Sequence, residues 1–267
     1  MDLGVRGKGY LVVGGSAGIG LAAASALVAD GGGVAIVGRN EARVAKAASA
    51  LRAHDDARVV ALTGDVTVPG EADRLVAEGV AVLGSLRGVA ITTGLGSRGQ
   101  KDLLGAADGD WHATFEDLLL ATVRVCRAVV PILVQSGGGS IVTTAAYSIH
   151  SPKAHQFPYA ALKSAVATLT KAIAKSYGGV GVRANCVCPG ATETDTLAAM
   201  RLRFAADRGW PVAEALERAM VQEWGMQVAL GRPGKPQELG DVIAFLLSER
   251  ASYLTGALVN VDGGTDF

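Results

Sequence analysis

The sequence predicts an α/β fold built on a doubly wound parallel sheet of seven strands. Two observations support this prediction: short β-type segments alternate with helical segments along the whole chain, and several strand segments are continuously apolar. Continuous apolarity is typical of strands covered on both faces, and parallel strands need crossover helices that provide this cover. We therefore expect helices on both faces of one sheet.

Seven segments have the composition of strands, because each combines apolar or β-branched residues with a glycine at or near one end. In chain order they are YLVVG from residue 10, GVAIVG from 33, RVVALTG from 58, GVAITTG from 88, GSIVTTAA from 139, GVRANCVC from 181 and ALVNVDGG from 257. Helical patterns lie between them at 19–30, 41–53, 70–83, 111–136, 158–177 and 236–248.

Length and charge favour one domain with a small-molecule partner. The 267 residues are 49% hydrophobic and have no Pro/Ser-rich linker, so 1–267 is treated as a single domain. Lys and Arg number 25, as do Asp and Glu, which predicts no nucleic-acid or membrane surface. No apolar run approaches the ~20 residues of a membrane span, and the start MDLGVRGKGY has no signal-peptide core. A cytoplasmic location is expected.

Cysteine and histidine usage predicts no metal site. Cys126, Cys186 and Cys188 are odd in number, and the last two would face the same side of a strand in VRANCVCPG. Buried reduced thiols are expected rather than a disulfide or a metal pair. The four histidines show no ligand spacing.

The turn VVGGSAGIG, residues 12–20, is the first candidate site element. It follows a strand and opens a helix, so Gly14, Gly18 and Gly20 can bring backbone N–H groups close to a phosphate at the positive helix end. An ordinary βα turn is the alternative, because the spacing differs from G-x-G-x-x-G. Ligands of doubly wound sheets bind at the carboxyl ends of the strands, so other strand ends should complete the site.

The ends of the second and third strands bear on the cofactor. An acidic residue about 20 positions past the glycines would bind the 2′-hydroxyl of NAD, whereas an arginine there accommodates the 2′-phosphate of NADP. Here Gly38 is followed by Arg39, so NADP(H) is favoured over NAD(H), although Arg39 could equally be solvated. Asp65 and Val66 follow the third strand; the Asp65 carboxylate could accept from the adenine amino group or cap the next helix.

A helix that opens on Pro158 carries a candidate acid/base pair. Tyr159 and Lys163 are four residues apart, so their side chains lie on one helix face. A phenol with a pKa of about 10 is a poor proton donor or acceptor at neutral pH, and a nearby cation favours the phenolate. The alternative is a surface tyrosine beside a solvated lysine.

Together these residues resemble the short-chain dehydrogenase/reductase family, in its single-domain form with a Rossmann-like fold. The resemblance covers nearly the whole chain. It rests on the turn with Gly14, Gly18 and Gly20, GDV at 64–66, Tyr159 with Lys163, RANCVCPGATET at 183–194 and GRPGKPQELGDVIAFLLSERASYLTGALVNVDGG at 231–264.

The resemblance implies that Tyr159 is the general acid/base, and that Lys163 lowers the pKa of Tyr159 and binds the nicotinamide ribose. It places the nicotinamide amide and phosphates near Thr192 and Thr194. Further cofactor contacts are expected at Ser16, Ile19, Arg39, Asp65, Val66, Thr93, Gly94, Pro189 and Gly190.

Several positions depart from the family pattern. The usual serine, thirteen residues before the tyrosine, is Ala146 in TTAAYSIHSPKAHQFPY, and alanine cannot donate a hydrogen bond to the substrate oxygen. Losing one such donor costs about 100- to 1000-fold in comparable sites. The usual asparagine of the fourth helix is Leu118. TTGL at 92–95 replaces NNAG, and Val13 stands where threonine is common.

Other side chains could replace the missing serine. Thr144 lies two residues before Ala146 on the same strand face, and Ser148 lies two residues after it, so both are candidate catalytic residues. The alternatives are core packing for Thr144 and a loop position for Ser148. His150 and His155 fall in the loop that leads to Tyr159, where a surface role is the more common one.

The stretch at about 195–228 is expected to form a helical substrate lid. A lid excludes water, and an apolar one would suit an apolar or cyclic substrate. The alternative is a pair of surface helices that bury their own apolar faces. The apolar residues of this stretch include Met200, Phe204, Trp210, Met220, Trp224 and Met226.

The predicted function is an NADP(H)-dependent oxidoreductase that interconverts a ketone and a secondary alcohol, with Tyr159 as general acid/base. The alternative is a nucleotide-binding sensor or partner protein that has lost turnover, which Ala146 and Leu118 favour. A third possibility is an enzyme whose substrate needs no serine. The fourth and fifth helices look apolar on more than one face, which in similar proteins accompanies a homotetramer.

Overall fold

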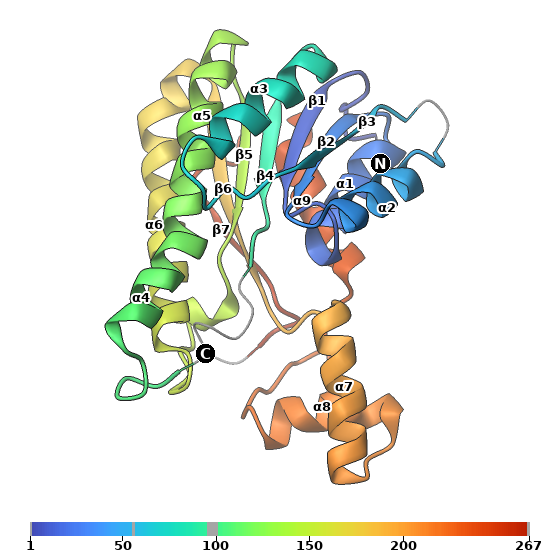
Figure 1. The fold of residues 1–267 in the computed structure, drawn as a ribbon, viewed down its shortest axis with the longest axis vertical. Helices are drawn as coiled ribbons and strands as arrows, with labels where there is room; N and C mark the ends of the chain where they lie inside the picture. The colour runs from blue at the N-terminus through green and yellow to red at the C-terminus, as the bar shows by residue number, and fades with distance from the viewer. Residues whose placement is uncertain (1, 55–56, 95–100, 266–267) are drawn as a thin grey trace.

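A single parallel sheet organises the described residues of the computed structural model, 2–54, 57–94 and 101–265, with seven strands in the order β3-β2-β1-β4-β5-β6-β7 (Figure 1). The direction of winding reverses between β1 and β4, which are neighbours in the sheet. The predicted fold class is confirmed. The strands are β1 (Gly9–Val13), β2 (Gly33–Gly38), β3 (Val59–Thr63), β4 (Gly88–Ile91), β5 (Gly139–Thr144), β6 (Val182–Pro189) and β7 (Leu258–Val261).

Helices cover both faces of the sheet. Alternate strand residues point to opposite sides, and on both sides these residues are apolar and need cover. Leu11 and Val13 of β1 belong to one core cluster, and Tyr10 and Val12 belong to the other. The first cluster lies under α3 (Glu71–Leu83), α5 (Ala121–Gln135) and α6 (Phe157–Tyr177). The second lies under α1 (Gly18–Ala29), α2 (Glu41–Leu51) and α9 (Pro236–Leu247).

The segment predicted as one helix over 111–136 differs from the expectation. It begins earlier, as α4 (Asp108–Thr114), passes through a π-helical turn at Phe115–Leu120, and continues as α5. The early start has a clear cause, since the Asp110 carboxylate accepts from the Ala107 N–H at 3.0 Å and satisfies a free donor at the helix end. The π-helical turn packs against α6.

The stretch after β6 forms two helices that stand beyond the carboxyl ends of the strands, α7 (Asp195–Arg208) and α8 (Val212–Gln222) (Figure 1). Their inner faces form a separate apolar cluster around Leu216, Met220 and Met226. We refer to residues 195–228 as the α7–α8 lobe. Within the described ranges, no helix has both the length and the apolarity needed to cross a lipid bilayer.

Candidate active site

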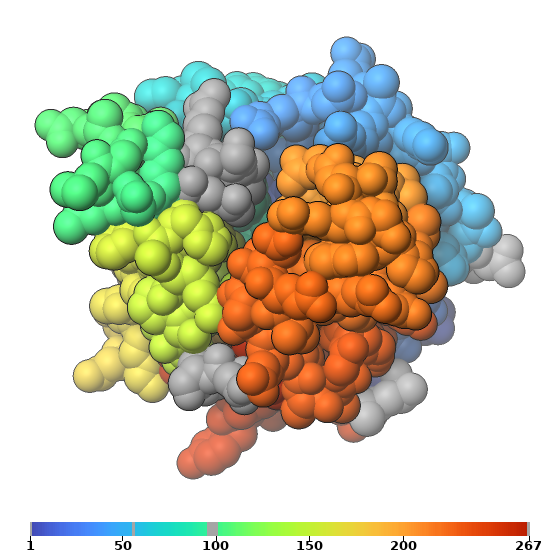
Figure 2. Space-filling model, turned by 90° about the horizontal axis from the view of Figure 1, so that it is seen from below, coloured from blue at the N-terminus to red at the C-terminus, as the bar shows by residue number. Residues whose placement is uncertain are grey.

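The predicted site residues meet at the carboxyl ends of the strands. The glycine-rich turn follows β1, Arg39 follows β2, Thr144 ends β5, and Gly190 follows β6. Figure 2 views the molecule from this end, where the α7–α8 lobe covers a large part of the face. The topology thus brings together residues from distant parts of the chain, as the parallel sheet predicts.

The glycine-rich turn after β1 leaves no room for side chains. Gly14 has φ +85° and Gly18 has φ +54°, a conformation that favours glycine. A Cβ at Gly14 would lie 2.8 Å from Thr92 Oγ1, and a Cβ at Gly20 would collide with the Gly14 carbonyl. The Thr92 hydroxyl donates to the Val13 carbonyl at 2.9 Å and so joins this turn to the end of β4. The backbone at the start of α1 is therefore bare, as a phosphate cradle requires.

The turn also lies against the loop that follows β6. A Cβ at Gly18 would lie 3.1 Å from Thr194 Cγ2, so these two elements close around one space. The Thr194 side chain makes no capping hydrogen bond at the start of α7. Thr192 is buried and its hydroxyl donates to the Gly190 carbonyl at 3.2 Å, while Pro189 ends the buried β6.

Arg39 and Asp65 are neighbours at the ends of β2 and β3. Arg39 Nη1 lies 3.9 Å from Asp65 Oδ2, and the Arg39 side chain is 71% exposed. The other Asp65 oxygen accepts from the Thr67 N–H and hydroxyl, at 3.0 and 2.8 Å. Ser16 sits beside the same strand end, since a Cβ at Gly38 would lie 2.7 Å from its Oγ. Arg39 is thus an exposed cation at the edge of the glycine-rich turn.

The remaining cofactor candidates are placed less directly. Val66 packs in the core, and Ile19 is half-buried against the other core cluster. Thr93 is half-buried and Gly94 is exposed after β4. Leu95 falls outside the described residues.

Tyr159 and Lys163 lie in the first two turns of α6, next to the end of β5. The Lys163 ammonium is 5.9 Å from the centroid of the Tyr159 ring and donates to the Thr144 carbonyl at 2.6 Å. Lys163 is 3% exposed, although it carries a charge. A buried lysine needs hydrogen-bond partners, and the Thr144 carbonyl provides one.

Burial dominates the electrostatics of this pair in the protein alone. It lowers the pKa of Lys163 to about 8, and it raises the pKa of Tyr159 to about 12, with a smaller contribution from Tyr147. The resemblance implied the opposite direction for Tyr159. The difference arises because burial of the phenol disfavours the charged phenolate. Tyr159 is therefore a protonated phenol at neutral pH, in the form that can donate a proton.

Two hydroxyls near Ala146 are buried without a hydrogen-bond partner. They are Thr144 Oγ1 and Ser148 Oγ, and Ser148 is 0% exposed. Buried hydroxyls normally have partners, so two unpartnered hydroxyls on either side of Ala146 are an unusual feature of this loop. Ala146 itself is buried and extended, with φ −163°.

The position of the family's asparagine is apolar in space as well as in sequence. Leu118 is 1% exposed and lies within the π-helical turn. Its carbonyl accepts from the Thr122 hydroxyl at 2.7 Å. The Leu118 side chain therefore offers no polar atom to a proton relay.

The loop before α6 contains residues that sequence reasoning ranked low or missed. His155 is exposed, and His150 Nε2 lies 3.2 Å from Asn260 Oδ1 near the end of β7. Tyr147, which was missed, packs against the apolar cluster of the α7–α8 lobe. The position of Tyr147 directly after Ala146, in the loop that follows β5, could have marked it as a residue near the site. Gln156 was missed too, and its Oε1 is buried without a hydrogen-bond partner.

The α7–α8 lobe buries much of its own apolar surface. Met220 and Met226 are buried, and Phe204 stacks edge-on against Trp224 with ring centroids 6.0 Å apart. Tyr147 and Ala191 extend this cluster to the loops beside the site. The helices therefore pack on each other, and their cluster reaches the loops that follow β5 and β6.

The cysteines are free and buried, as predicted, and Cys186 and Cys188 share a small cluster with Ala145 and Ala167. In the part of the chain that the structure describes, no three metal-ligating side chains form a group.

Comparison with known proteins agrees with this geometry. Residues 13–266 match the family described as Enoyl-(Acyl carrier protein) reductase. The chain is 29% identical to the 3-oxoacyl-(acyl-carrier-protein) reductase FabG of Chlamydia muridarum, over 96% of both chains. It is 31% identical to Dehydrogenase/reductase SDR family member 4 of Oryctolagus cuniculus, over 96% of this chain and 93% of the relative.

A solved structure resembles this one over nearly its full length. L-sorbose reductase of Gluconobacter frateurii, complexed with NADPH and L-sorbose, has a TM-score of 0.91 at 30% identity, covering 99% of this chain and 98% of that one. The sheet order, the bare glycine turn and the Tyr159–Lys163 pair fit these matches. The chain therefore belongs to the short-chain dehydrogenase/reductase family, whose members are NAD(P)(H)-binding oxidoreductases.

Proposed function

We propose that this protein is an NADP(H)-dependent reductase that interconverts a ketone and a secondary alcohol, with Tyr159 as the general acid/base. The observation that carries the proposal is the placement of Tyr159 beside the buried Lys163, at the strand ends where the glycine-rich turn also lies. Lys163 alone could hold a ribose, but the phenol beside it adds a proton donor, which only turnover requires.

The proton has a defined source. With its pKa raised to about 12, Tyr159 holds its proton at neutral pH and can give it to a carbonyl oxygen. When bound, NADPH supplies the hydride that the carbonyl carbon accepts. Lys163 stabilises the phenolate left on Tyr159, and it is held in place by the Thr144 carbonyl. In the reverse direction Tyr159 must first lose its proton, which a positively charged nicotinamide favours.

NADP(H) is the proposed cofactor because of Arg39. Its guanidinium is mostly exposed at the end of β2 and has one distant carboxylate neighbour, Asp65 at 3.9 Å. A 2′-phosphate can therefore reach it without breaking a short ion pair. NAD(H) has no such group and gains nothing from Arg39.

The substrate oxygen needs a second hydrogen-bond donor in place of the missing serine. Ser148 and Thr144 are the proposed donors, because both hydroxyls are buried and unpartnered. Each has a proton that can turn toward a ligand at no cost in existing hydrogen bonds.

The proposed substrate is apolar or cyclic, and the α7–α8 lobe is the proposed lid. Tyr147 connects the lobe's apolar cluster to the loop that carries Ser148. Closing the lobe over the strand ends would exclude water from the Tyr159 hydroxyl. The proposal treats residues 1–267 as one catalytic domain that includes this lid.

A homotetramer and a cytoplasmic location stay predictions.

The first experiment is a binding titration of the purified protein with NADPH and NADH. It is followed by an assay in which the absorbance of NADPH is monitored in the presence of each compound of a panel of ketones and quinones. NADPH binding with consumption by a carbonyl compound is the expected result. Binding without consumption across a broad panel would favour the nucleotide sensor, which Ala146 and Leu118 support.

A further inference from the structure

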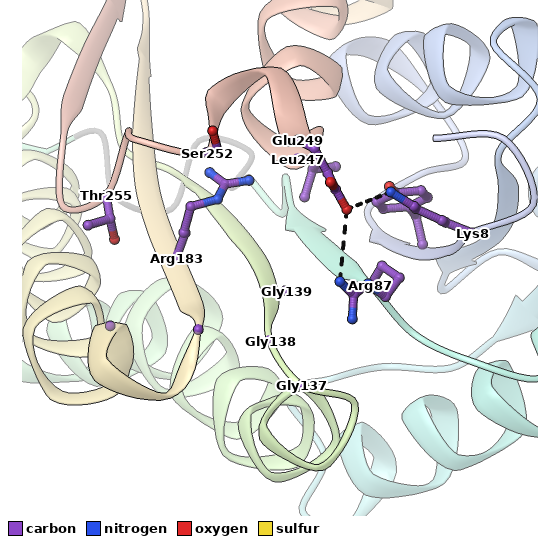
Figure 3. Close-up of a pocket in the computed structure, with 13 residues that line it drawn as sticks. Lys8, Arg87, Gly137, Gly138, Gly139, Arg183, Leu247, Glu249, Ser252 and Thr255 are labelled. Atoms are coloured by element: carbon purple, nitrogen blue, oxygen red, sulfur yellow. Dashed lines mark hydrogen bonds and ion pairs between the residues drawn. The ribbon is translucent and has the colours of Figure 1, made fainter. Parts of the chain in front are cut away.

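A cavity of about 390 Å³ lies at the opposite end of the sheet from the active site (Figure 3). Its lining comes from the amino ends of the strands: Tyr10 near the start of β1, Arg87 before β4, Gly139 at the start of β5, and Arg183 in β6. The cavity is therefore separate from the cofactor site, which lies at the carboxyl ends.

The cavity has a surplus of positive charge. Lys8, Arg87 and Arg183 line it together with one carboxylate, Glu249. The Glu249 carboxylate lies 2.6 Å from Lys8 Nζ and 3.9 Å from Arg87 Nη2, and its side chain is 66% exposed (Figure 3). One exposed carboxylate is thus shared by two cations. With three cations and one carboxylate, the net charge of the lining is positive.

Arg183 is held by main-chain carbonyls and not by a carboxylate. Its Nη2 donates to the Ser248 carbonyl at 2.9 Å, and its Nη1 donates to the Leu254 carbonyl at 3.2 Å. These bonds fix the guanidinium without neutralising it. The charge remains available to an anion in the cavity.

Tyr10 adds an unused donor. Its side chain is 1% exposed and lines the cavity, and no hydrogen bond within the described ranges involves its hydroxyl. The hydroxyl oxygen is not sealed from solvent, so a ligand in the cavity can reach it. Burial, together with Glu249, raises the pKa of Tyr10 to about 12, so the hydroxyl keeps its proton and can donate. The ring has room because Gly88 lacks a Cβ, which would lie 3.2 Å from Tyr10 Cδ1.

We propose that this cavity binds a small dianion with the chemistry of phosphate, either free or as a small monoester, with Lys8, Arg87 and Arg183 as its cations and the Tyr10 hydroxyl as a donor. A tetrahedral dianion has enough oxygens to accept from all four groups and matches a surplus of two positive charges. It takes the place of the Glu249 carboxylate beside Arg87, and Glu249 is free to move because it is mostly exposed. The cavity volume of about 390 Å³ suits a small molecule rather than a polyanion.

The test is a calorimetric titration with inorganic phosphate at constant ionic strength, using the full chain. Arg87→Gln and Tyr10→Phe should each weaken binding by about tenfold, as expected for loss of one hydrogen bond to a charged group. Arg127→Gln is the matched control, because Arg127 is exposed on α5 away from the cavity and its loss changes the net charge equally. Glu249→Gln should tighten binding, since it removes the competing carboxylate.

Phosphate can also bind at the glycine-rich turn, so Arg39→Gln is titrated in parallel. Binding that responds to Arg39→Gln and not to Tyr10→Phe or Arg87→Gln overturns the proposal, as does the absence of binding at millimolar phosphate. Thermal unfolding of each variant shows that it is folded, and Tyr10→Phe retains the ring that packs in the core. A parallel titration with glycerol phosphate identifies the natural class of ligand. Tighter binding of glycerol phosphate than of inorganic phosphate indicates a monoester site, and the reverse indicates a site for free phosphate.

Discussion

The Lys163 ammonium donates to the main-chain carbonyl of Thr144 at 2.6 Å, which ties α6 to the end of β5. Thr144 is also the residue whose own hydroxyl is buried without a partner. The same short contact therefore sets the distance between the acid/base pair and one proposed substrate donor.

Tyr159→Phe should lower the rate of carbonyl reduction by at least about 1000-fold, because it removes the proton donor and keeps the ring. NADPH affinity should change little, since the ribose contact is expected from Lys163. Single-turnover rates and a NADPH binding titration measure both effects. Tyr177→Phe, at the far end of the same helix, is the control and should be silent. Intact turnover in Tyr159→Phe would falsify the proposed mechanism.

Lys163→Met should stabilise the protein at pH 7 by about 1–3 kcal/mol while abolishing activity, because it removes a buried charge. The folded pKa is about 8 and the ordinary value is 10.5. Between these two pH values the unfolded chain binds more protons, so the free energy of unfolding of the native protein rises with pH. The advantage of Lys163→Met should therefore be full below pH 8 and shrink toward pH 10.5.

Denaturant unfolding of both proteins from pH 6 to pH 10, a range of about two units on each side of the shifted pKa, tests this prediction. Lys175→Met is the control, since Lys175 is exposed on the same helix. A stability difference that does not vary with pH would contradict the assignment of Lys163 as the titrating group.

Ser148→Ala and Thr144→Val separate the two proposed donors. Removing a buried hydroxyl without a partner should leave stability unchanged or raise it by about 1 kcal/mol. The variant that removes the working donor should lower kcat by about 100-fold, whereas the other should not. Thermal unfolding and steady-state rates are measured on both, with Ser164→Ala as a control on α6. If neither variant lowers kcat, the substrate needs no second hydroxyl from this loop.

Arg39→Glu should weaken NADPH binding by about tenfold or more and leave NADH binding unchanged or improved, because the new carboxylate repels the 2′-phosphate and accepts from a 2′-hydroxyl. Lys46→Glu makes the same charge change on the exposed face of α2 and is the control. Fluorescence titrations with both cofactors measure the ratio. Equal losses for NADPH and NADH would mean that Arg39 does not distinguish them.

The sequence predicted the sheet because each strand carries its own signal, an apolar run next to a glycine. It also predicted that the glycine-rich turn and the ends of the other strands lie at one edge of the sheet, since parallel topology determines where strand ends lie. The π-helical turn at Phe115–Leu120 was not predictable, because its residues are helix formers and its geometry depends on packing against α6.

Burial was the other unpredictable quantity. The direction of the Tyr159 pKa depends on how much protein surrounds the phenol, and the i, i+4 spacing does not contain that information. The same is true of Tyr10, which reads as an ordinary apolar strand residue in YLVVG and becomes an unpartnered donor in the folded chain.

Strand β6 joins the two ends of the molecule, since it begins beside Arg183 and ends at Pro189. Six residue steps of a parallel strand span about 20 Å, which is more than twice the distance of about 8 Å over which physiological salt screens charge. Phosphate groups at the two ends would thus scarcely repel each other. The cofactor and the phosphate ligand could therefore be bound at the same time, and the occupancy of each site would depend only on the concentration of its own ligand.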